Sequence, residues 1–434
     1  MRLIRLLKND LAHEIESWVD DGLISGQQAE TICERYGIDL HDASRHSYGY
    51  YLLVALGYLF IGLAVITLLS ANWEQIPREL RMGGLIAITL GINLLGLRHF
   101  LADRVKAATL AFLLGSIMYG ASIMLIAQIY HLGEHFPDGI YWWALGALPS
   151  ALLLQSRLLM ALVIALATTW FFVESDMGFY PASYPLFLCA LGWLVLLRKQ
   201  SLLLFLVLVA AIGLWLEYTL AWWLADGWGF EFSGLNVTLT AGLMILLFAL
   251  GHWLLSVTNE NWRDYGTLLD IWVIRLALIL LLVMSFDRVW PDVMADLQQA
   301  RWWNTSLVLL AAIGAALLNA LTPAPRLSVW FFAVMYALLF LVAAWIDTSQ
   351  ALALQVIDNL LLVGIGIWLI QSGIARRVSH YFYLGVAAVL ITGLVRYIDL
   401  IGDYVGAAVL FIVFALILLA SARYWRTMES GGKK

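Results

Sequence analysis

The sequence predicts an all-α, polytopic membrane protein with about fourteen transmembrane helices, and three observations support this fold class. Of its 434 residues, 62% are hydrophobic and only 13% are charged, whereas soluble domains average about 45–50% apolar and about 25% charged. Apolar runs of up to about 25 residues, long enough to cross a bilayer, recur along most of the chain. Nineteen of the 25 lysines and arginines fall in alternate loops, as expected if these loops face the cytoplasm.

The first 48 residues are mostly polar and are predicted to form a separate cytosolic helical hairpin. Apolar residues at three- and four-residue spacing, among them Ile15, indicate one amphipathic helix that ends near Gly22. Ser25 and Gln28 have the spacing of a capping box and open a second helix. Two helices this short cannot form a stable core alone. We therefore expect the module 1–48 to dock on the bundle, on a second copy, or on a cytosolic or membrane protein partner.

The apolar runs that follow form the predicted transmembrane bundle, residues 49–422. Several runs are short, so twelve to fourteen spans are compatible with the sequence. Fourteen agrees best with the loop charges, because losing one span would invert every later loop. Residues 423–434 are then a cytosolic tail, and both termini are cytoplasmic. The predicted spans are 50–70, 82–98, 107–130, 140–154, 158–173, 183–197, 201–225, 236–257, 268–286, 304–321, 328–345, 351–370, 381–400 and 404–422.

The first third of the chain resembles a known family. The residues that carry the resemblance are Trp18, Gly22, Ile24, Ser25, Gln28 and Tyr36, then the segment Ala71 to Pro77, and then the segment Ala127 to His131. This pattern resembles the bacterial predicted membrane proteins grouped as domain of unknown function 2157, most clearly over residues 1–150. The resemblance implies a protein of the bacterial inner membrane with a cytosolic amino-terminal module. It supplies no reaction, ligand or catalytic residue.

Ionisable residues inside the predicted spans are the first candidates for a functional site. Placing such a charge at mid-bilayer costs about 2.5–3.5 kcal/mol, so these residues need a partner or a wet cavity. At about 1.5 Å per helical residue, three of them lie roughly 6–12 Å below the predicted outer surface. These three are Glu217, Asp358 and Arg396; Asp270 and Arg275 lie near the inner end of their span, and Asp399 lies at an outer boundary.

Two pairings of the outer charges are open. Asp358 and Arg396 lie on consecutive predicted spans and form the preferred ion pair, with Asn359 beside them. Arg396 and Asp399 are three residues apart on one helix, so an intrahelical pair is the alternative. The charges either fix helix packing as structural pairs or line an outward-opening pathway. On the second interpretation the candidates for a substrate or ion pathway are Glu217, Asp358, Asn359, Arg396 and Asp399.

The predicted outer loop after the third span has the spelling H-x-x-E-H, from His131 through Glu134 to His135. Zinc hydrolases with this motif need one continuous helix that places both histidines on one face. Here Gly133 interrupts the motif and Pro137 follows it, so no metal site is expected. A polar loop that hydrogen-bonds neighbours or a substrate is the favoured interpretation.

Tryptophans are concentrated at the predicted outer ends of the spans. Interfacial belts explain most of them, although an excess on one side also suits stacking against a sugar ring or a lipid-linked glycan. Together with the polar loop, Trp73, Trp142 and Trp143 are the candidates for an outer vestibule. The longest outer loop, residues 287–303, is expected to form a short interfacial helix, with a lid over a site as the alternative.

Two functions from different classes remain. The favoured one is a secondary carrier or flippase for a small polar, amphiphilic or lipid-linked solute, because the spans are many and the buried charges cluster. The alternative is a non-transporting membrane scaffold or envelope sensor whose amino-terminal module recruits a partner. No catalytic residue and no cofactor is predicted, so an enzyme is the least favoured class. A net charge of −5 without a basic stripe argues against nucleic-acid binding, whereas the lipid bilayer is a direct partner.

Overall fold

The computed structural model describes most of the chain between residues 77 and 399, and it confirms the all-α class. Its described residues are 14, 15, 17–19, 21–36, 53, 54, 56–61, 63, 64, 67, 77–131, 135–225, 227–286, 288–376, 378–399 and 412. Within these residues the secondary structure is helical and no strand occurs. Nine of the described helices are long and apolar enough to cross a membrane. The count of about fourteen stays a prediction.

Every apolar run predicted between residues 82 and 400 coincides with a helix. The runs at 50–70 and 404–422 lie largely outside the described residues. The helices are α5 (Arg78–Leu101), α6 (Val105–Tyr130), α7 (Pro137–Leu154), α8 (Arg157–Asp176), α9 (Tyr184–Gly192) with the π-helical turn Trp193–Arg198, α10 (Leu202–Leu224), α11 (Gly234–Ser256), α12 (Glu260–Met284), α14 (Arg301–Ala320), α15 (Leu327–Trp345), α16 (Ala351–Arg376) and α17 (Ser379–Asp399).

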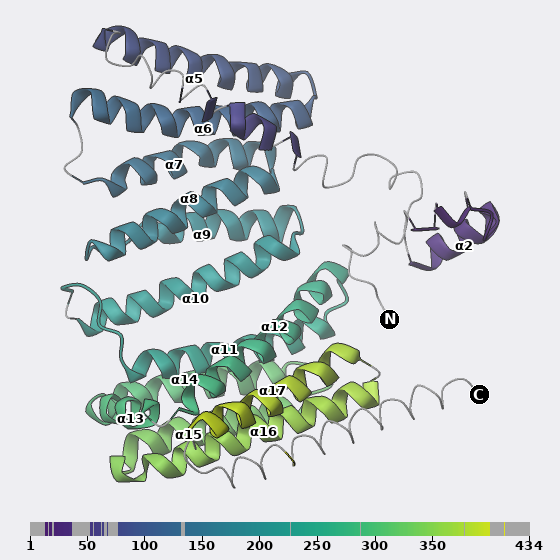
Figure 1. Ribbon diagram of the computed structural model, residues 1–434, viewed down its shortest axis with the longest axis vertical. Helices are drawn as coiled ribbons and strands as arrows, with labels where there is room; N and C mark the ends of the chain where they lie inside the picture. The colour runs from purple at the N-terminus through teal and green to yellow at the C-terminus, as the bar shows by residue number, and fades with distance from the viewer. Residues whose placement is uncertain are drawn as a thin grey trace. The chain divides into compact units, whose positions relative to one another are not determined.

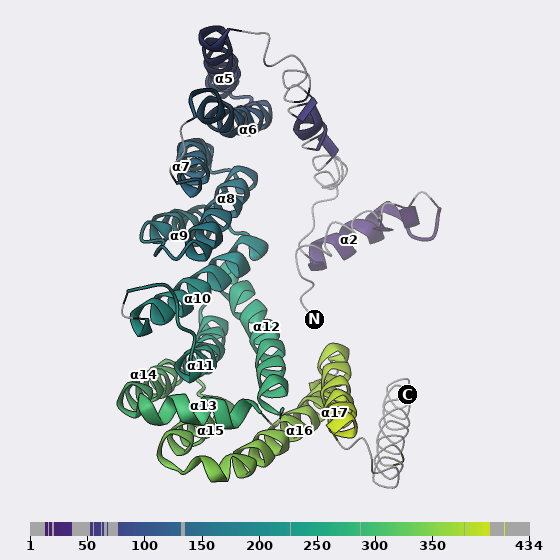
Figure 2. The same cartoon turned by 60° about the vertical axis from the view of Figure 1, so that its left-hand side comes forward.

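The chain divides into two compact units, residues 1–212 and 213–434. This division falls inside the predicted bundle, while the predicted boundaries at residues 48 and 422 lie outside the described residues and stay predictions. In the first unit α5 to α9 pack against one another in chain order (Figures 1 and 2). The ring of Trp143 on α7 occupies the place that a Cβ on Gly120 of α6 would take. Glycine therefore allows these two helices to approach closely.

The amino-terminal segment contains α2 (Gly26–Tyr36) and a small apolar cluster. Ile15, Ala29 and Cys33 are buried against one another. The predicted capping box is present, because the Ser25 amide donates to Gln28 Oε1 at 2.9 Å and the Gln28 amide donates to Ser25 Oγ at 3.3 Å. Most of the first predicted helix lies outside the described residues, so the hairpin itself stays a prediction.

In the second unit, helix pairs that follow one another in the chain pack through glycine. Helix α11 packs on α12 and α14, and α16 packs on α12 and α17 (Figure 1). A Cβ on Gly266 of α12 would lie 2.7 Å from the carbonyl oxygen of Gly251 on α11, which is closer than any real Cβ contact. The same holds between Gly385 of α17 and the carbonyl oxygen of Gly366 on α16. Small residues therefore set the backbone separation in both pairs.

The helix predicted in the loop 287–303 is present as α13 (Val289–Gln299), and its position at the membrane surface stays a prediction. Its apolar face packs inside the second unit against α11, α15 and α16, where Trp290, Met294 and Leu297 are fully buried. Asp296, which also faces α11, accepts a hydrogen bond from the Gly234 amide at 2.7 Å and so adds a cap to α11. An amphipathic stripe can be buried by protein as well as by lipid, and here protein covers it.

Candidate functional site

The second unit contains an apolar cavity of about 130 Å³ among α11, α12, α15 and α16. Met244, Leu281, Met335 and Leu339 are typical of its lining. We call this space the central cavity. The faces of α11, α12 and α16 that border this space are apolar, and so are their outward faces. Such a lining favours a solute with an apolar body.

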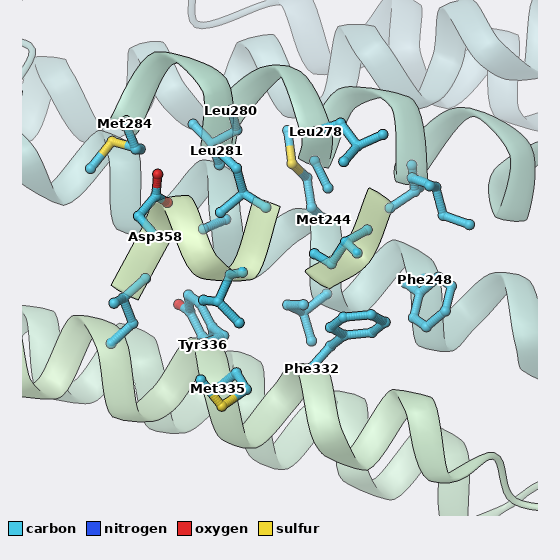
Figure 3. Close-up of a pocket in the computed structure, with 18 of the residues that line it drawn as sticks. Met244, Phe248, Leu278, Leu280, Leu281, Met284, Phe332, Met335, Tyr336 and Asp358 are labelled. Carbon is cyan, nitrogen blue, oxygen red and sulfur yellow. The ribbon is translucent and has the colours of Figure 1, made fainter. Parts of the chain in front are cut away.

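Asp358 on α16 is the carboxyl group among the described residues that line the central cavity. Its side chain is 0% exposed. Figure 3 shows Asp358 beside Met284 at one end of the labelled side chains, with Phe248 at the other end. A carboxyl group in such surroundings interacts strongly with any cation or hydrogen-bond donor that enters, because the local dielectric constant is low.

Two further polar groups line the same cavity. The Tyr336 hydroxyl donates to the carbonyl oxygen of Thr238 at 3.1 Å. The indole N–H of Trp290 is buried and has no hydrogen-bond acceptor in the described part of the chain. A buried donor without an acceptor costs about 1–3 kcal/mol, which a bound acceptor would remove. Trp290 was not among the predicted site residues, because tryptophan at a helix end is ordinarily an interfacial residue.

The structure places two other predicted pathway residues, Glu217 and Asn359, apart from the central cavity. Glu217 on α10 accepts hydrogen bonds from Thr240 Oγ1 at 2.7 Å and from Asn236 Nδ2 at 2.8 Å, both on α11. Asn359 Nδ2 donates to the Gln355 carbonyl oxygen one turn earlier on α16, at 2.7 Å. Neither Glu217 nor Asn359 lines the cavity.

The pairings predicted for the thirteenth span stay predictions. Arg396 and Asp399 lie on α17, but their side chains are outside the described part of the structure. The structure therefore tests neither the Asp358–Arg396 pair nor the intrahelical alternative.

A second polar cluster lies around Asp270 on α12, and its partners were not among the predicted site residues. The Tyr381 hydroxyl donates to Asp270 Oδ2 at 3.0 Å, and Arg326 Nη1 lies 3.7 Å from Asp270 Oδ1. Tyr381 lies on α17 and Arg326 directly precedes α15, so no local pattern links them to Asp270. By contrast, Arg275 donates from Nη1 to the Ile271 carbonyl oxygen of its own helix at 2.6 Å.

The predicted outer vestibule belongs to the first unit. His131 ends α6 with a left-handed φ of 53°, so the motif is not on one continuous helix. His135 Nε2 lies 2.9 Å from Glu174 Oε2. Glu134 and Trp73 lie outside the described residues. Within the described residues no group of three possible metal ligands occurs.

The two tryptophans of the predicted vestibule differ in their surroundings. Trp142 is exposed. The Trp143 indole donates to the Ser116 carbonyl oxygen at 2.7 Å and lines an apolar cavity of about 400 Å³. No ionisable side chain is found among the described residues that line this cavity. This cavity therefore has room for an apolar solute, but it has no charged group that would orient the solute.

The amino-terminal third of the chain matches a known protein family. Residues 16–160 match the family of predicted membrane proteins DUF2157. The match confirms the resemblance to domain of unknown function 2157 that the sequence showed. The DUF2157 segment ends before the second unit begins, so the central cavity and Asp358 lie beyond it. No curated protein and no solved structure matches the chain.

Proposed function

We propose that this membrane protein is a secondary carrier or flippase for a small amphiphilic solute, and that the central cavity binds that solute. The observation that carries the proposal is Asp358, a fully buried carboxyl group on the wall of a largely apolar cavity. An ionisable residue inside a membrane-spanning helix is by default a candidate for a functional site, because such residues are rare there and mark substrate or ion pathways.

The chemistry of the cavity indicates the class of solute. Its volume of about 130 Å³ is close to that of an engineered cavity of about 150 Å³ that holds benzene. A solute with a short apolar body therefore fits, whereas a lipid-linked glycan does not. A cationic head would neutralise the Asp358 carboxylate, and ion pairing at a desolvated site needs this complementarity. Short-chain alkylammonium ions combine these two properties.

Neutralising Asp358 is expected to abolish solute uptake and to leave the protein folded. Asparagine has nearly the same shape as aspartate but cannot pair with a cation, so uptake of butyltrimethylammonium into proteoliposomes should fall at least about tenfold. The matched control is Asp347→Asn in the exposed turn before α16, where Asp347 accepts from the Ser349 amide. This control should transport like the wild type. Equal uptake by the Asp358→Asn and wild-type proteins would reject the proposed site.

The amino-terminal module supports the alternative function, a scaffold or sensor that recruits a partner. In its described part Ile15, Ala29 and Cys33 form a small apolar cluster, and Leu23 is exposed. If the protein is a carrier, deleting residues 1–40 should leave butyltrimethylammonium uptake within about twofold of the wild type, because the cavity lies in the second unit. Loss of the cellular function with uptake intact would favour the scaffold.

A further inference from the structure

A groove of about 260 Å³ lies on the surface of the second unit between α12 and α17. Helix α16 packs against both of these helices and contributes the buried Leu362 to the lining. We call this space the lateral groove. Apart from Arg275 and Thr392, the described residues that line it are aliphatic. Ile279 and Ile391 are 57% and 45% exposed, so the groove opens toward lipid.

The lateral groove is elongated along the helix axes. On α12 the lining residues Arg275, Ile279 and Leu282 follow one another at a spacing of three and four residues, so they share one helix face. On α17 the lining residues Leu384 and Ile391 are seven residues apart, which again is one face. From Arg275 to Leu282 the groove extends over about 10 Å of helix. A long apolar space of this kind matches an extended hydrocarbon chain.

Arg275 is the cation of the lateral groove, and it lies at the end nearer the beginning of α12. Its Nη1 donates to the Ile271 carbonyl oxygen at 2.6 Å, so the guanidinium points one turn back toward that end. Its Cζ lies 5.8 Å from the centre of the Trp272 ring. In the described part of the chain no carboxylate forms an ion pair with Arg275. A guanidinium has five N–H donors, so most of them are available to an anion.

The guanidinium of Arg275 reaches the level at which helices of this unit begin. Arg326, which directly precedes α15, lies 3.7 Å from Asp270, and Tyr381 near the beginning of α17 donates to the same carboxylate. A chain that crosses lipid can leave the helical conformation only near the membrane surface. Ile271, whose carbonyl oxygen Arg275 contacts, is the residue after Asp270. Arg275 therefore extends to the headgroup level, although its backbone lies deeper.

Basic groups gather at this end of the lateral groove. His380 at the beginning of α17 is exposed and lies close enough to Arg275 to be affected by its charge. The sequence between α16 and α17 adds Arg376 and Arg377. Asp270 is occupied by partners of its own. Basic pockets between membrane helices attract the headgroups of anionic lipids.

We propose that the lateral groove binds a phospholipid with an anionic headgroup, with its phosphate on Arg275 and one acyl chain along the groove. The guanidinium donates to two phosphate oxygens, and the chain covers the aliphatic walls. A phosphate ion in solution would use Arg275 alone and leave these walls uncovered. A zwitterionic headgroup would bring a second cation beside the basic groups. The proposal concerns the lipid-facing side of the second unit, and it does not depend on the carrier function.

Lipid binding to the delipidated full chain tests this proposal. The protein in dodecyl maltoside is titrated with dioleoylphosphatidylglycerol, and bound lipid is measured by native mass spectrometry. Dioleoylphosphatidylcholine has the same chains with a zwitterionic headgroup, and dioleoylglycerol has them without a phosphate. Phosphatidylglycerol should bind with a dissociation constant at least about tenfold lower than either of these. Equal affinities for the three lipids would overturn the proposal.

Substitution of Arg275 tests the contact with the phosphate. With Arg275→Gln the dissociation constant for phosphatidylglycerol should rise about tenfold, while that for phosphatidylcholine should change little. Arg275→Lys keeps a charge without the planar fork, so it should lie between the two. The matched control is Arg288→Gln, because Arg288 is exposed, directly precedes α13 and does not line the groove. This control should bind like the wild type. An equal loss with Arg275→Gln and Arg288→Gln would show that only the total charge matters, and would overturn the site.

Filling the lateral groove tests the contact with the acyl chain. Ala387 lines the groove on α17, so Ala387→Leu occupies part of that space and leaves Arg275 in place. The dissociation constant for phosphatidylglycerol should rise about tenfold, since fewer methylene groups of the lipid are buried. Ala353→Leu at an exposed position of α16 is the control and should bind like the wild type. Unchanged binding by Ala387→Leu, or displacement of the lipid by excess inorganic phosphate, would overturn the assignment to a phospholipid.

Discussion

Replacement of Gly366 by leucine should separate α16 from α17 and destabilise the second unit more than any other substitution considered. A Cβ at this position would lie 2.8 Å from Val389 Cγ2 and 3.2 Å from the Gly385 carbonyl oxygen. Because neighbouring backbone occupies this space, rotation of a side chain alone cannot relieve the overlap. Overpacking costs about 1–3 kcal/mol and occasionally more, and here it also removes the close approach on which helix association in lipid depends.

The matched control lies two residues away on the same helix. No heavy atom lies within 4 Å of a Cβ built on Gly364, so Gly364→Leu adds the same side chain without overlap. Thermal unfolding in detergent should show a midpoint lower by about 5 °C or more for Gly366→Leu, and little change or a small increase for Gly364→Leu. Equal midpoints for the two variants would show that the separation of α16 and α17 is not set by Gly366.

Filling the central cavity should block uptake as completely as removing its carboxyl group. Ala277 on α12 lines the cavity, and phenylalanine at this position would place an aromatic ring in a space of about 130 Å³. The solute would then have to displace a covalently attached ring. Butyltrimethylammonium uptake into proteoliposomes should therefore fall at least about tenfold, although the fold loses no more than about 1–3 kcal/mol from overpacking.

The neighbouring residue provides the control for cavity filling. Leu276 is 45% exposed and does not line the cavity, so Leu276→Phe adds an aromatic ring on the outward side of the same helix. It should transport like the wild type. Unchanged uptake by Ala277→Phe would mean that the solute does not pass through the central cavity, even if Asp358 proves to be essential.

The helices of the bundle could be predicted from the sequence, because the patterns that indicate them lie within each helix. A run of apolar residues long enough to cross lipid folds as a helix wherever it is placed, since the bilayer offers its backbone no other hydrogen-bond partner. The capping box of Ser25 and Gln28 is equally local, as it lies within one turn. The charge of a buried residue is also visible in the sequence, and Asp358 was selected for that reason.

The partners of the buried ionisable residues could not be predicted from the sequence, because they come from distant parts of the chain. Arg326 and Tyr381 meet at Asp270 through the packing of α12, α15 and α17. The apolar stripe of α13 has the same pattern whether lipid or protein covers it, and only the neighbouring helices decide that protein does.

The sequence by itself determined that this protein is helical, that it belongs in a membrane, and which ionisable residues lie within apolar segments. Only the tertiary structure decided that Asp358 lines a cavity and that Glu217 is bound by Asn236 and Thr240 of the next helix. The physical reason is that hydrophobicity and helix length act along the chain, whereas a cavity is the space left between side chains of several helices. Such a space depends on how those helices pack, which no single segment specifies.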